Sequence, residues 1–268
     1  MESTLTIRGC RYFVTAQGHG RPLLMLHGFT GSSQSWRELI PTLSSRFQVI
    51  TVDLLGHGRT DSPPDPTRYQ MAEATADLLA ILSELNVARA DLLGYSMGGR
   101  LALYTAVHYP HRINRLVLES ASPGLKSEQE RQERRQRDNA LADRIEREGI
   151  ESFVNFWEQL SLWDSQKQLD TAVRQKLREQ RLQNNPAGLA NSLRGMGTGS
   201  QPSLWGQLGN LTMPVLLQTG ELDGKFTAIN RQMAAQMPTA QLKIIPNAGH
   251  TVHLERPSLF SQILLTTT

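Results

Sequence analysis

Residues 91–100 read DLLGYSMGGR, the segment of the sequence that most clearly indicates the fold. The apolar pair Leu92-Leu93 is typical of a short buried strand, and a helical pattern begins after the glycines. Between them lies a G-x-S-x-G motif, whose glycines relieve crowding at a sharp turn that lifts the hydroxyl of Ser96 above a sheet. The stretch therefore predicts a nucleophilic serine between a strand and a helix. A plain glycine-rich turn is the alternative.

Short apolar runs continue the pattern on both sides of this stretch. They are typical of strands that are buried on both faces, and they occupy residues 23–26, 49–52, 116–118, 215–219 and 242–245. Helical periodicity separates them, over residues 71–85, 101–109 and 228–237, and a short last helix is expected after Pro257. This alternation predicts the α/β class, with a mostly parallel sheet and helices on both faces.

The alternation stops between residues 124 and 208, where the chain is helical and polar. Residues 126–148 carry acidic and basic side chains in equal numbers, which is typical of a solvated helix face. We expect a helical cap over the sheet. The predicted division is a core of residues 1–122 and 209–268, with a cap of residues 123–208 inserted in the same domain.

Two further residues follow strands in the order that a catalytic triad requires. Asp223 closes GELD (220–223), and His250 closes NAGH (247–250). The carboxyl ends of parallel strands meet at one edge of a sheet, so both side chains are expected near Ser96. The order Ser96, Asp223, His250 is the one found in enzymes with a serine elbow on a parallel sheet. Asp53 precedes Ser96, which argues against it as the triad acid.

The turn His27-Gly28-Phe29 follows the first apolar run. A backbone N–H from this turn and the N–H of Met97 would together form an oxyanion hole, and His27 itself is expected to be structural. His57 is expected to be structural or to line a pocket. His253 resembles half of a metal site with His250, but no third ligand accompanies them. We expect an exposed His253 and no metal.

Arg100 lies four residues after Ser96, one turn along the expected helix. A guanidinium there suggests that the substrate carries a carboxylate or a phosphate. The alternative is an arginine that extends to solvent or pairs with a nearby acid.

Composition excludes several classes of protein. The net charge of +3 over 268 residues gives no case for nucleic acid, and no apolar run approaches the ~18 residues of a membrane helix. The N-terminus MESTLTIRGC lacks the apolar segment of a secretory signal. The single cysteine, Cys10, permits neither an internal disulfide nor a Cys-x-x-Cys zinc site. We expect a cytoplasmic protein with a small-molecule partner and no cofactor; a monomer is favoured, although the oligomeric state stays open.

Several segments together resemble one branch of the α/β-hydrolase superfamily. They are LGYSMGGR (93–100), SPGL (122–125), GTGSQPSLW (197–205), GELDGKF (220–226) and NAGHTVHLERP (247–257). The branch is that of the 2-succinyl-6-hydroxy-2,4-cyclohexadiene-1-carboxylate synthases of menaquinone or phylloquinone biosynthesis. The likeness runs from His27 to Pro257.

This resemblance implies a lyase that expels pyruvate from the tricarboxylate 2-succinyl-5-enolpyruvyl-6-hydroxy-3-cyclohexene-1-carboxylate. Ser96, polarised by His250 and Asp223, would act as the base, and the amides of Phe29 and Met97 would hold the enolate oxygen. The resemblance also assigns substrate binding to Tyr95, Arg100, Arg134, Trp157 and Arg181. Arg135 is an alternative to Arg134, and Lys225 lies either near the site or on the surface.

Two other functions compete with this interpretation. A carboxylesterase or C–C bond hydrolase would use the same triad through an acyl-enzyme. A scaffold that binds a ligand without turnover is the second alternative, and an intact triad argues against it.

Overall fold

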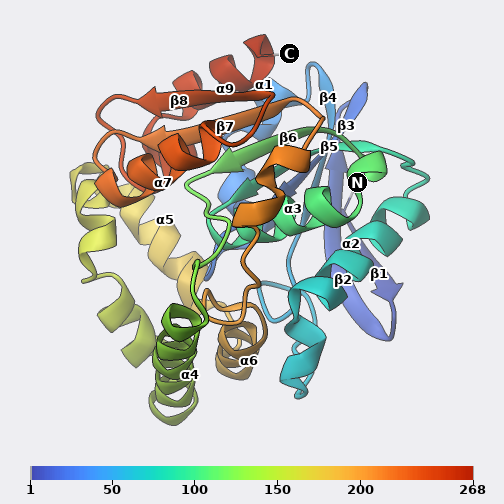
Figure 1. The fold of residues 1–268 in the computed structure, drawn as a ribbon. Helices are drawn as coiled ribbons and strands as arrows, with labels where there is room; N and C mark the ends of the chain where they lie inside the picture. Colours follow the sequence, from blue (N-terminus) through green and yellow to red (C-terminus); the bar gives the residue numbers. More distant parts are fainter. Residues whose placement is uncertain (1, 268) are drawn as a thin grey trace.

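The computed structural model describes residues 2–267, which form an eight-stranded sheet surrounded by helices (Figure 1). The strands are β1 (Glu2–Ile7), β2 (Cys10–Gln17), β3 (Arg21–Leu26), β4 (Phe47–Val52), β5 (Ala90–Tyr95), β6 (Ile113–Glu119), β7 (Val215–Gly220) and β8 (Ala240–Ile245). The α-helices are α1 (Ile40–Leu43), α2 (Met71–Glu84), α3 (Met97–His108), α4 (Glu128–Trp157), α5 (Thr171–Leu182), α6 (Pro186–Met196), α7 (Gly224–Ala234), α8 (Val252–Glu255) and α9 (Pro257–Thr266). Short 3₁₀ helices are η1 (Ser33–Trp36), η2 (Pro66–Tyr69), η3 (Pro110–Arg112), η4 (Ser161–Gln168) and η5 (Trp205–Asn210).

The sheet has the strand order β1-β2-β4-β3-β5-β6-β7-β8. All neighbours from β4 to β8 pair in parallel, whereas β2 runs antiparallel to both β1 and β4. This topology confirms the predicted α/β class with a mostly parallel sheet. The carboxyl ends of β5, β7 and β8 lie at one edge, and the loops after them carry the three predicted triad residues.

Both faces of the sheet are buried, because helices cover each of them. Alternate side chains of a central strand therefore enter different cores. Leu24 and Leu26 of β3 join the core that α2 and α3 cover. Leu23 and Met25 of the same strand join the core that α1 and α9 cover. Such two-sided burial is the reason that the strands appear as continuous apolar runs in the sequence.

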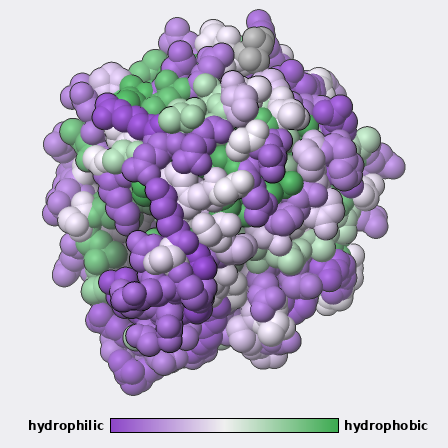
Figure 2. Space-filling model, in the orientation of Figure 1, coloured by the Kyte–Doolittle hydropathy of each residue, from purple (hydrophilic) through white to green (hydrophobic). Residues whose placement is uncertain are grey.

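We refer to residues 123–208 as the cap. Its helices α4 and α6 share a small apolar core of their own, to which Phe153 and Leu189 belong. Gly149, at φ +79°, breaks α4 near its end, in a conformation that L side chains rarely adopt. The face of α4 seen in Figure 2 is almost wholly hydrophilic, which accounts for the charged run in its sequence.

The N-terminal hairpin and the start of α7 differ from the sequence-based expectation. β1 and β2 pair as an antiparallel hairpin at the sheet edge, where β1 alternates exposed and partly buried residues instead of forming an apolar run. α7 begins at Gly224, earlier than predicted, because Asp223 caps it by accepting the backbone N–H of Phe226. The expected last helix is present as α9, which buries Phe260 and Leu264 against the sheet.

Candidate active site

Ser96 is the single residue between the end of β5 and the start of α3. Its φ of +50° and ψ of −108° lie outside the regions that a serine ordinarily occupies. The turn is also crowded: a Cβ on Gly94 would collide with the carbonyl of Gly98, and one on Gly98 would collide with the carbonyl of Leu26. The packed glycines therefore hold a strained turn whose hydroxyl faces a cavity.

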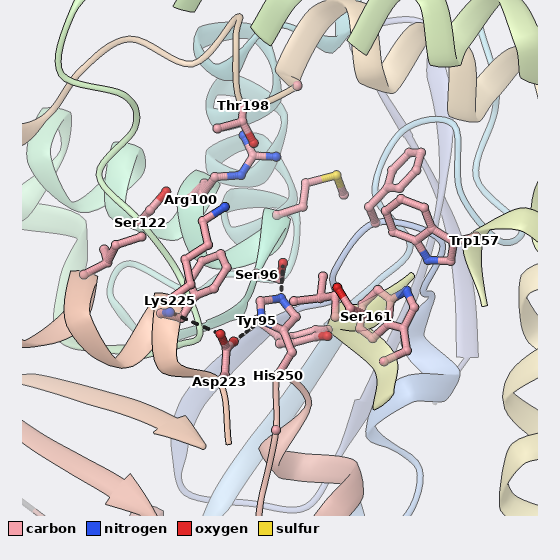
Figure 3. A pocket seen from close by; sticks show the side chains of 18 of the residues that line it. Tyr95, Ser96, Arg100, Ser122, Trp157, Ser161, Thr198, Asp223, Lys225 and His250 are labelled. Carbon is pink, nitrogen blue, oxygen red and sulfur yellow. Dashed lines mark hydrogen bonds and ion pairs between the residues drawn. The ribbon is translucent and has the colours of Figure 1, made fainter. Parts of the chain in front are cut away.

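The structure brings the three predicted triad side chains together (Figure 3). His250 Nε2 lies 3.0 Å from Ser96 Oγ, and His250 Nδ1 lies 2.6 Å from Asp223 Oδ2. The second carboxylate oxygen of Asp223 accepts the backbone N–H of Phe226 at 3.1 Å. This geometry lets His250 take the proton of Ser96 while Asp223 holds the imidazole in position.

The two residues predicted for the oxyanion hole both line the cavity beside Ser96. Met97 is the first residue of α3, where backbone N–H groups have no partner within the helix. Phe29 lies in the turn after β3, which the N–H of Gly31 closes by donating to the carbonyl of Gly28 at 3.0 Å. The placement suits a pair of amides that would stabilise a developing oxyanion.

Two buried histidines support the loop beneath this turn. His27 Nε2 accepts the N–H of Leu54 at 2.9 Å, which suits the structural role expected for it. Burial lowers the pKa of His27 to about 4. Burial, and then the neighbouring His27, lower the pKa of His57 to about 3. Both imidazoles are therefore neutral near pH 7.

The expectation for His253 was wrong. The side chain is buried, and its Nδ1 lies 2.8 Å from a carboxylate oxygen of Glu119, which is fully buried at the end of β6. The backbone N–H of His253 donates to the same carboxylate at 2.9 Å. Its partner residue lies far away in the sequence, so a local pattern did not indicate the burial.

A cavity of about 770 Å³ lies over Ser96, between the sheet edge and the cap. Core loops and cap elements both line it, including Ser122, Arg134, Trp157, Ser161, Trp163 and Phe226. In Figure 3, Arg100 and Trp157 lie on opposite sides of the view, with Ser96 between them. The cavity therefore has a cationic side and an aromatic side around the nucleophile.

Arg100 is buried in this cavity wall. Its Nη1 donates to the carbonyl of Met196 at 2.7 Å and to Gln201 Oε1 at 3.3 Å. Within residues 2–267 it forms no ion pair with a carboxylate. Burial, and then the nearby Arg134, lower its pKa to about 10, which still leaves the guanidinium charged near pH 7. Among the described residues, Arg100 therefore follows neither alternative that the sequence leaves open: it does not extend to solvent and it does not pair with an acid.

The cap arginines have different surroundings. Arg134 lines the cavity and donates to Asp138 Oδ1 at 2.7 Å, whereas Arg135 turns to the carbonyl of Gly199 and to Glu128. Trp157 lines the cavity as expected. Arg181 does not line it; it borders a second cavity of about 610 Å³, because Glu158 Oε1 holds its Nη1 at 2.9 Å.

Tyr95 lies between the two cavities and lines both of them. Its hydroxyl lies 2.7 Å from Thr251 Oγ1, and burial strongly raises the pKa of its phenol. Lys225 lines the first cavity from the first turn of α7, with an exposed side chain.

The chain is similar to proteins of known family and structure. Residues 21–257 match the α/β hydrolase fold family. A protein of Enterobacter sp. (strain 638), named 2-succinyl-6-hydroxy-2,4-cyclohexadiene-1-carboxylate synthase, is 33% identical over 90% of this chain and 89% of its own length. A Bacillus subtilis (strain 168) protein, whose name assigns it the same activity provisionally, is 48% identical over 96% of this chain and 94% of its own.

This chain belongs to that synthase family, within the α/β hydrolases. The solved structure of MenH from S. aureus agrees, with a TM-score of 0.90 and 39% identity, covering 95% of this chain and 96% of that one. A thermophilic esterase from Thermogutta terrifontis shares the fold at a TM-score of 0.85 and 25% identity, covering 99% of this chain and 97% of that one.

Sequence reasoning missed several residues that shape the site of this synthase family member. Gln201 accepts a hydrogen bond from Arg100 and donates to the carbonyl of Ser122 at 3.2 Å, so it holds the guanidinium at the cavity wall. Trp163 packs its ring 5.7 Å from that of His250, edge to face. Gln201 lies in the segment 197–205 that carries the resemblance, which was the available signal.

The chain was also expected to lack a metal site and a membrane-spanning helix. Among residues 2–267, no group of three or more His, Cys, Asp or Glu side chains could hold a metal ion. No helix in the same range has the length and apolar character needed to cross a membrane.

Proposed function

We propose that this chain eliminates pyruvate from 2-succinyl-5-enolpyruvyl-6-hydroxy-3-cyclohexene-1-carboxylate to give 2-succinyl-6-hydroxy-2,4-cyclohexadiene-1-carboxylate, in menaquinone or phylloquinone biosynthesis. One observation carries the proposal: Arg100, a buried arginine with no carboxylate partner in the part of the chain that the structure describes, lies in the same cavity as Ser96 and His250. An uncompensated buried cation favours an anionic ligand, and this substrate has three carboxylates.

The chemistry begins with a proton transfer. Ser96 Oγ takes the ring proton next to the succinyl ketone while its own proton passes to His250 Nε2, 3.0 Å away. The electron pair of the C–H bond moves onto the ketone oxygen, where the amides of Phe29 and Met97 stabilise the enolate. The enolate then collapses to the conjugated diene and breaks the C–O bond. Enolpyruvate leaves, takes up a proton and becomes pyruvate, without an acyl-enzyme.

Substrate recognition divides between the two sides of the cavity. Arg100 and Arg134 supply positive charge. Asp138 binds Arg134 through Nε, so the Nη atoms of Arg134 can bind a ligand. Trp157 supplies apolar contact for the ring, and Tyr95 shapes the floor beside Ser96. Arg181 is not assigned to direct contact, because it lies outside this cavity.

The deciding experiment measures pyruvate release from the enolpyruvyl tricarboxylate. We expect fast release with the wild-type protein, and release at the uncatalysed rate with Ser96→Ala and without protein. The Ser96→Ala variant retains the cavity, so equal release by both would show that Ser96 is not the base. Release at background by the wild type would reject the reaction itself.

The same preparation separates the competing functions. A carboxylesterase would turn over p-nitrophenyl acetate rapidly and leave the tricarboxylate intact, since the triad distances suit an acyl-enzyme equally well. A non-catalytic scaffold would bind the tricarboxylate, seen by calorimetry, and transform neither compound. Arg100, which is buried and forms no ion pair among the described residues, favours the lyase over the carboxylesterase and the non-catalytic scaffold.

We also propose that the protein acts as a cytoplasmic monomer on this small molecule. The single cysteine supports a reducing compartment. The triad and its cavity are built from one chain, which supports function without a partner subunit. Light scattering on the purified protein tests the monomer.

A further inference from the structure

We propose that Gln166 and Thr251 are positioning residues that join the cap to both catalytic loops. The inference rests on the proposed function, because it concerns the same triad. Thr251 Oγ1 lies 2.7 Å from the hydroxyl of Tyr95 and accepts Gln166 Nε2 at 2.9 Å. Tyr95 directly precedes Ser96, and Thr251 directly follows His250. One hydroxyl therefore links the neighbour of the nucleophile to the neighbour of the base.

Arg181 begins this chain of hydrogen bonds. Its Nη1 is held by Glu158 Oε1, and its Nη2 donates to Gln166 Oε1 at 3.3 Å. A guanidinium has only donors, so the amide of Gln166 must present its oxygen to Arg181 and its NH₂ to Thr251. The orientation of Gln166 is thus set from the cap, by an arginine that does not line the triad cavity.

The chain of hydrogen bonds is largely buried, although all four of its residues border the second cavity. Gln166, Thr251 and Arg181 are each 5–6% exposed, and Tyr95 is 8% exposed. Removing the partner of a largely buried hydroxyl costs free energy, so each bond in the chain constrains the next. Arg181 lies on α5 and Gln166 on η4, both in the cap, whereas Thr251 and Tyr95 belong to the core.

Thr251 has little freedom to move. The carboxylate of Glu255 accepts the backbone N–H of Gly249 at 2.7 Å and that of Thr251 at 3.2 Å, so it clamps the loop on both sides of His250. The ring of Tyr95 packs 5.5 Å from that of His250. With the loop backbone held in this way, the bonds of the Thr251 hydroxyl to Gln166 and Tyr95 fix how the His250 loop meets Tyr95, and the Ser96–His250 alignment depends on these bonds.

The test uses Thr251→Val and Gln166→Leu, which remove the hydrogen bonds and keep the approximate shape. Two readouts are measured: kcat and KM for pyruvate release, and the rate at which a fluorophosphonate labels Ser96. In labelling, Ser96 Oγ bonds to phosphorus, fluoride leaves and His250 takes the proton, so the rate reports triad alignment without the tricarboxylate. We expect both kcat and labelling to fall about 3- to 10-fold, as for one lost buried hydrogen bond, with KM almost unchanged.

Four further variants, including Tyr95→Phe alone, complete the design. Thr251→Ser keeps the hydroxyl and should restore both rates. Thr75→Val makes the same change at a buried threonine on α2, bonded to Thr105, and should leave both rates at the wild-type level. Gln166→Leu combined with Tyr95→Phe should lose less than the product of the two single losses, because both side chains act through one hydroxyl.

Several results would overturn the inference. They are an unchanged labelling rate in Gln166→Leu, multiplicative losses in the double variant, or a raised KM at constant kcat, which would mean direct contact with substrate. Gln166→Leu keeps the test valid if Thr251→Val does not fold. A wild-type protein that is labelled but releases no pyruvate would reject the proposed reaction alone, and labelling would still decide the positioning role.

Discussion

Arg100 and Arg115 are both buried arginines, and they differ in what balances their charge. Arg115 donates through Nε to Asp91 Oδ2 at 3.0 Å, so the fold supplies its counter-charge. Among residues 2–267, Arg100 has only the carbonyl of Met196 and the amide oxygen of Gln201 as acceptors. A buried charge without a paired charge lowers the stability of the fold, so the protein retains Arg100 at a disadvantage that binding of an anion would remove.

This contrast predicts opposite effects for the same substitution. Arg100→Met should leave the melting temperature equal or higher, while kcat/KM for the tricarboxylate falls about 10- to 100-fold, the value of one charge-assisted hydrogen bond. Arg115→Met should lower the free energy of unfolding by about 3–5 kcal/mol, because Asp91 loses a partner, and leave kcat/KM of the folded protein near the wild-type value. Thermal melts and steady-state kinetics measure both. Equal losses of stability in the two variants would contradict the argument.

The orientation of some single residues could not be predicted from the sequence. Arg134 and Arg135 are neighbours on α4, and successive positions on a helix point about 100° apart, so only packing decides which one faces the cavity. Arg181 was assigned by resemblance, but its orientation depends on Glu158, on another cap element. Ser96, Asp223 and His250 were predictable because each follows directly after a strand end, which the backbone alone places.

At the scale of elements, the elbow depends on how closely β5, α3 and β3 approach one another. The approach at Gly98 is very close, since a Cβ there would collide with the carbonyls of Leu26 and His27. Those carbonyls belong to β3 and to the turn that leads to Phe29. Any side chain at Gly98 would push the helix away from both.

We therefore expect Gly98→Ala to lower the free energy of unfolding by about 1–3 kcal/mol, as overpacking usually does, and to reduce kcat because Met97 and Phe29 separate. Gly206→Ala is the matched control: a Cβ there meets no heavy atom within 4 Å, and its φ is not positive. It should keep native stability within about 1 kcal/mol and native kcat. Urea unfolding and pyruvate release measure the two effects. Native kcat in Gly98→Ala would show that the spacing at the elbow is not critical.

Elements differ in how much of them could be predicted. The inner strands were evident because both faces are buried, whereas β1 was not, because one of its faces meets solvent and its residues alternate. The start of α7 was placed too late, because apolar periodicity marks the packed residues and not the capped first turn. The individual cap helices were not resolved, since their charged outer faces mask the apolar stripe.

For the whole molecule, His27 and His57 connect stability to pH. Their imidazoles take up protons near pH 6.5 in the unfolded chain, but only near pH 4 and pH 3 in the folded protein. The unfolded state therefore binds more protons below pH 6.5, and acid favours it. The stability associated with these groups is present above pH 6.5 and is lost as the pH falls from 6.5 toward 4 and 3.

We expect the free energy of unfolding to fall with pH in this window, with each histidine contributing up to about 1.4 kcal/mol per pH unit. His57→Asn should flatten the dependence, since an amide takes up no proton. His111→Asn, at an exposed position, should leave it unchanged. Denaturant unfolding from pH 7 to pH 4 provides the comparison. Parallel curves for wild type and His57→Asn would refute the assignment.

The division into a core and a cap at residues 123–208 stays a prediction. The cap contributes Trp157 and Trp163 to the cavity and shares an apolar contact with Phe29 of the core. A sequence can indicate that a helical segment is inserted, because strand signals stop and later resume. It cannot show how that segment sits on the sheet, because few local features record contacts between distant residues.

The position of the cap between β6 and β7 also affects the order in which the sheet and the triad form. β7 pairs with β6 across the whole cap, with Leu116 opposite Val215, so this contact closes a long loop and forms slowly. Asp223 and His250 both lie beyond β7, whereas Ser96 lies before the cap. During synthesis, Ser96 therefore leaves the ribosome long before His250, its base. Until the last strands dock, a nascent chain carries an unactivated serine, and the reactive hydroxyl arises only together with the finished sheet.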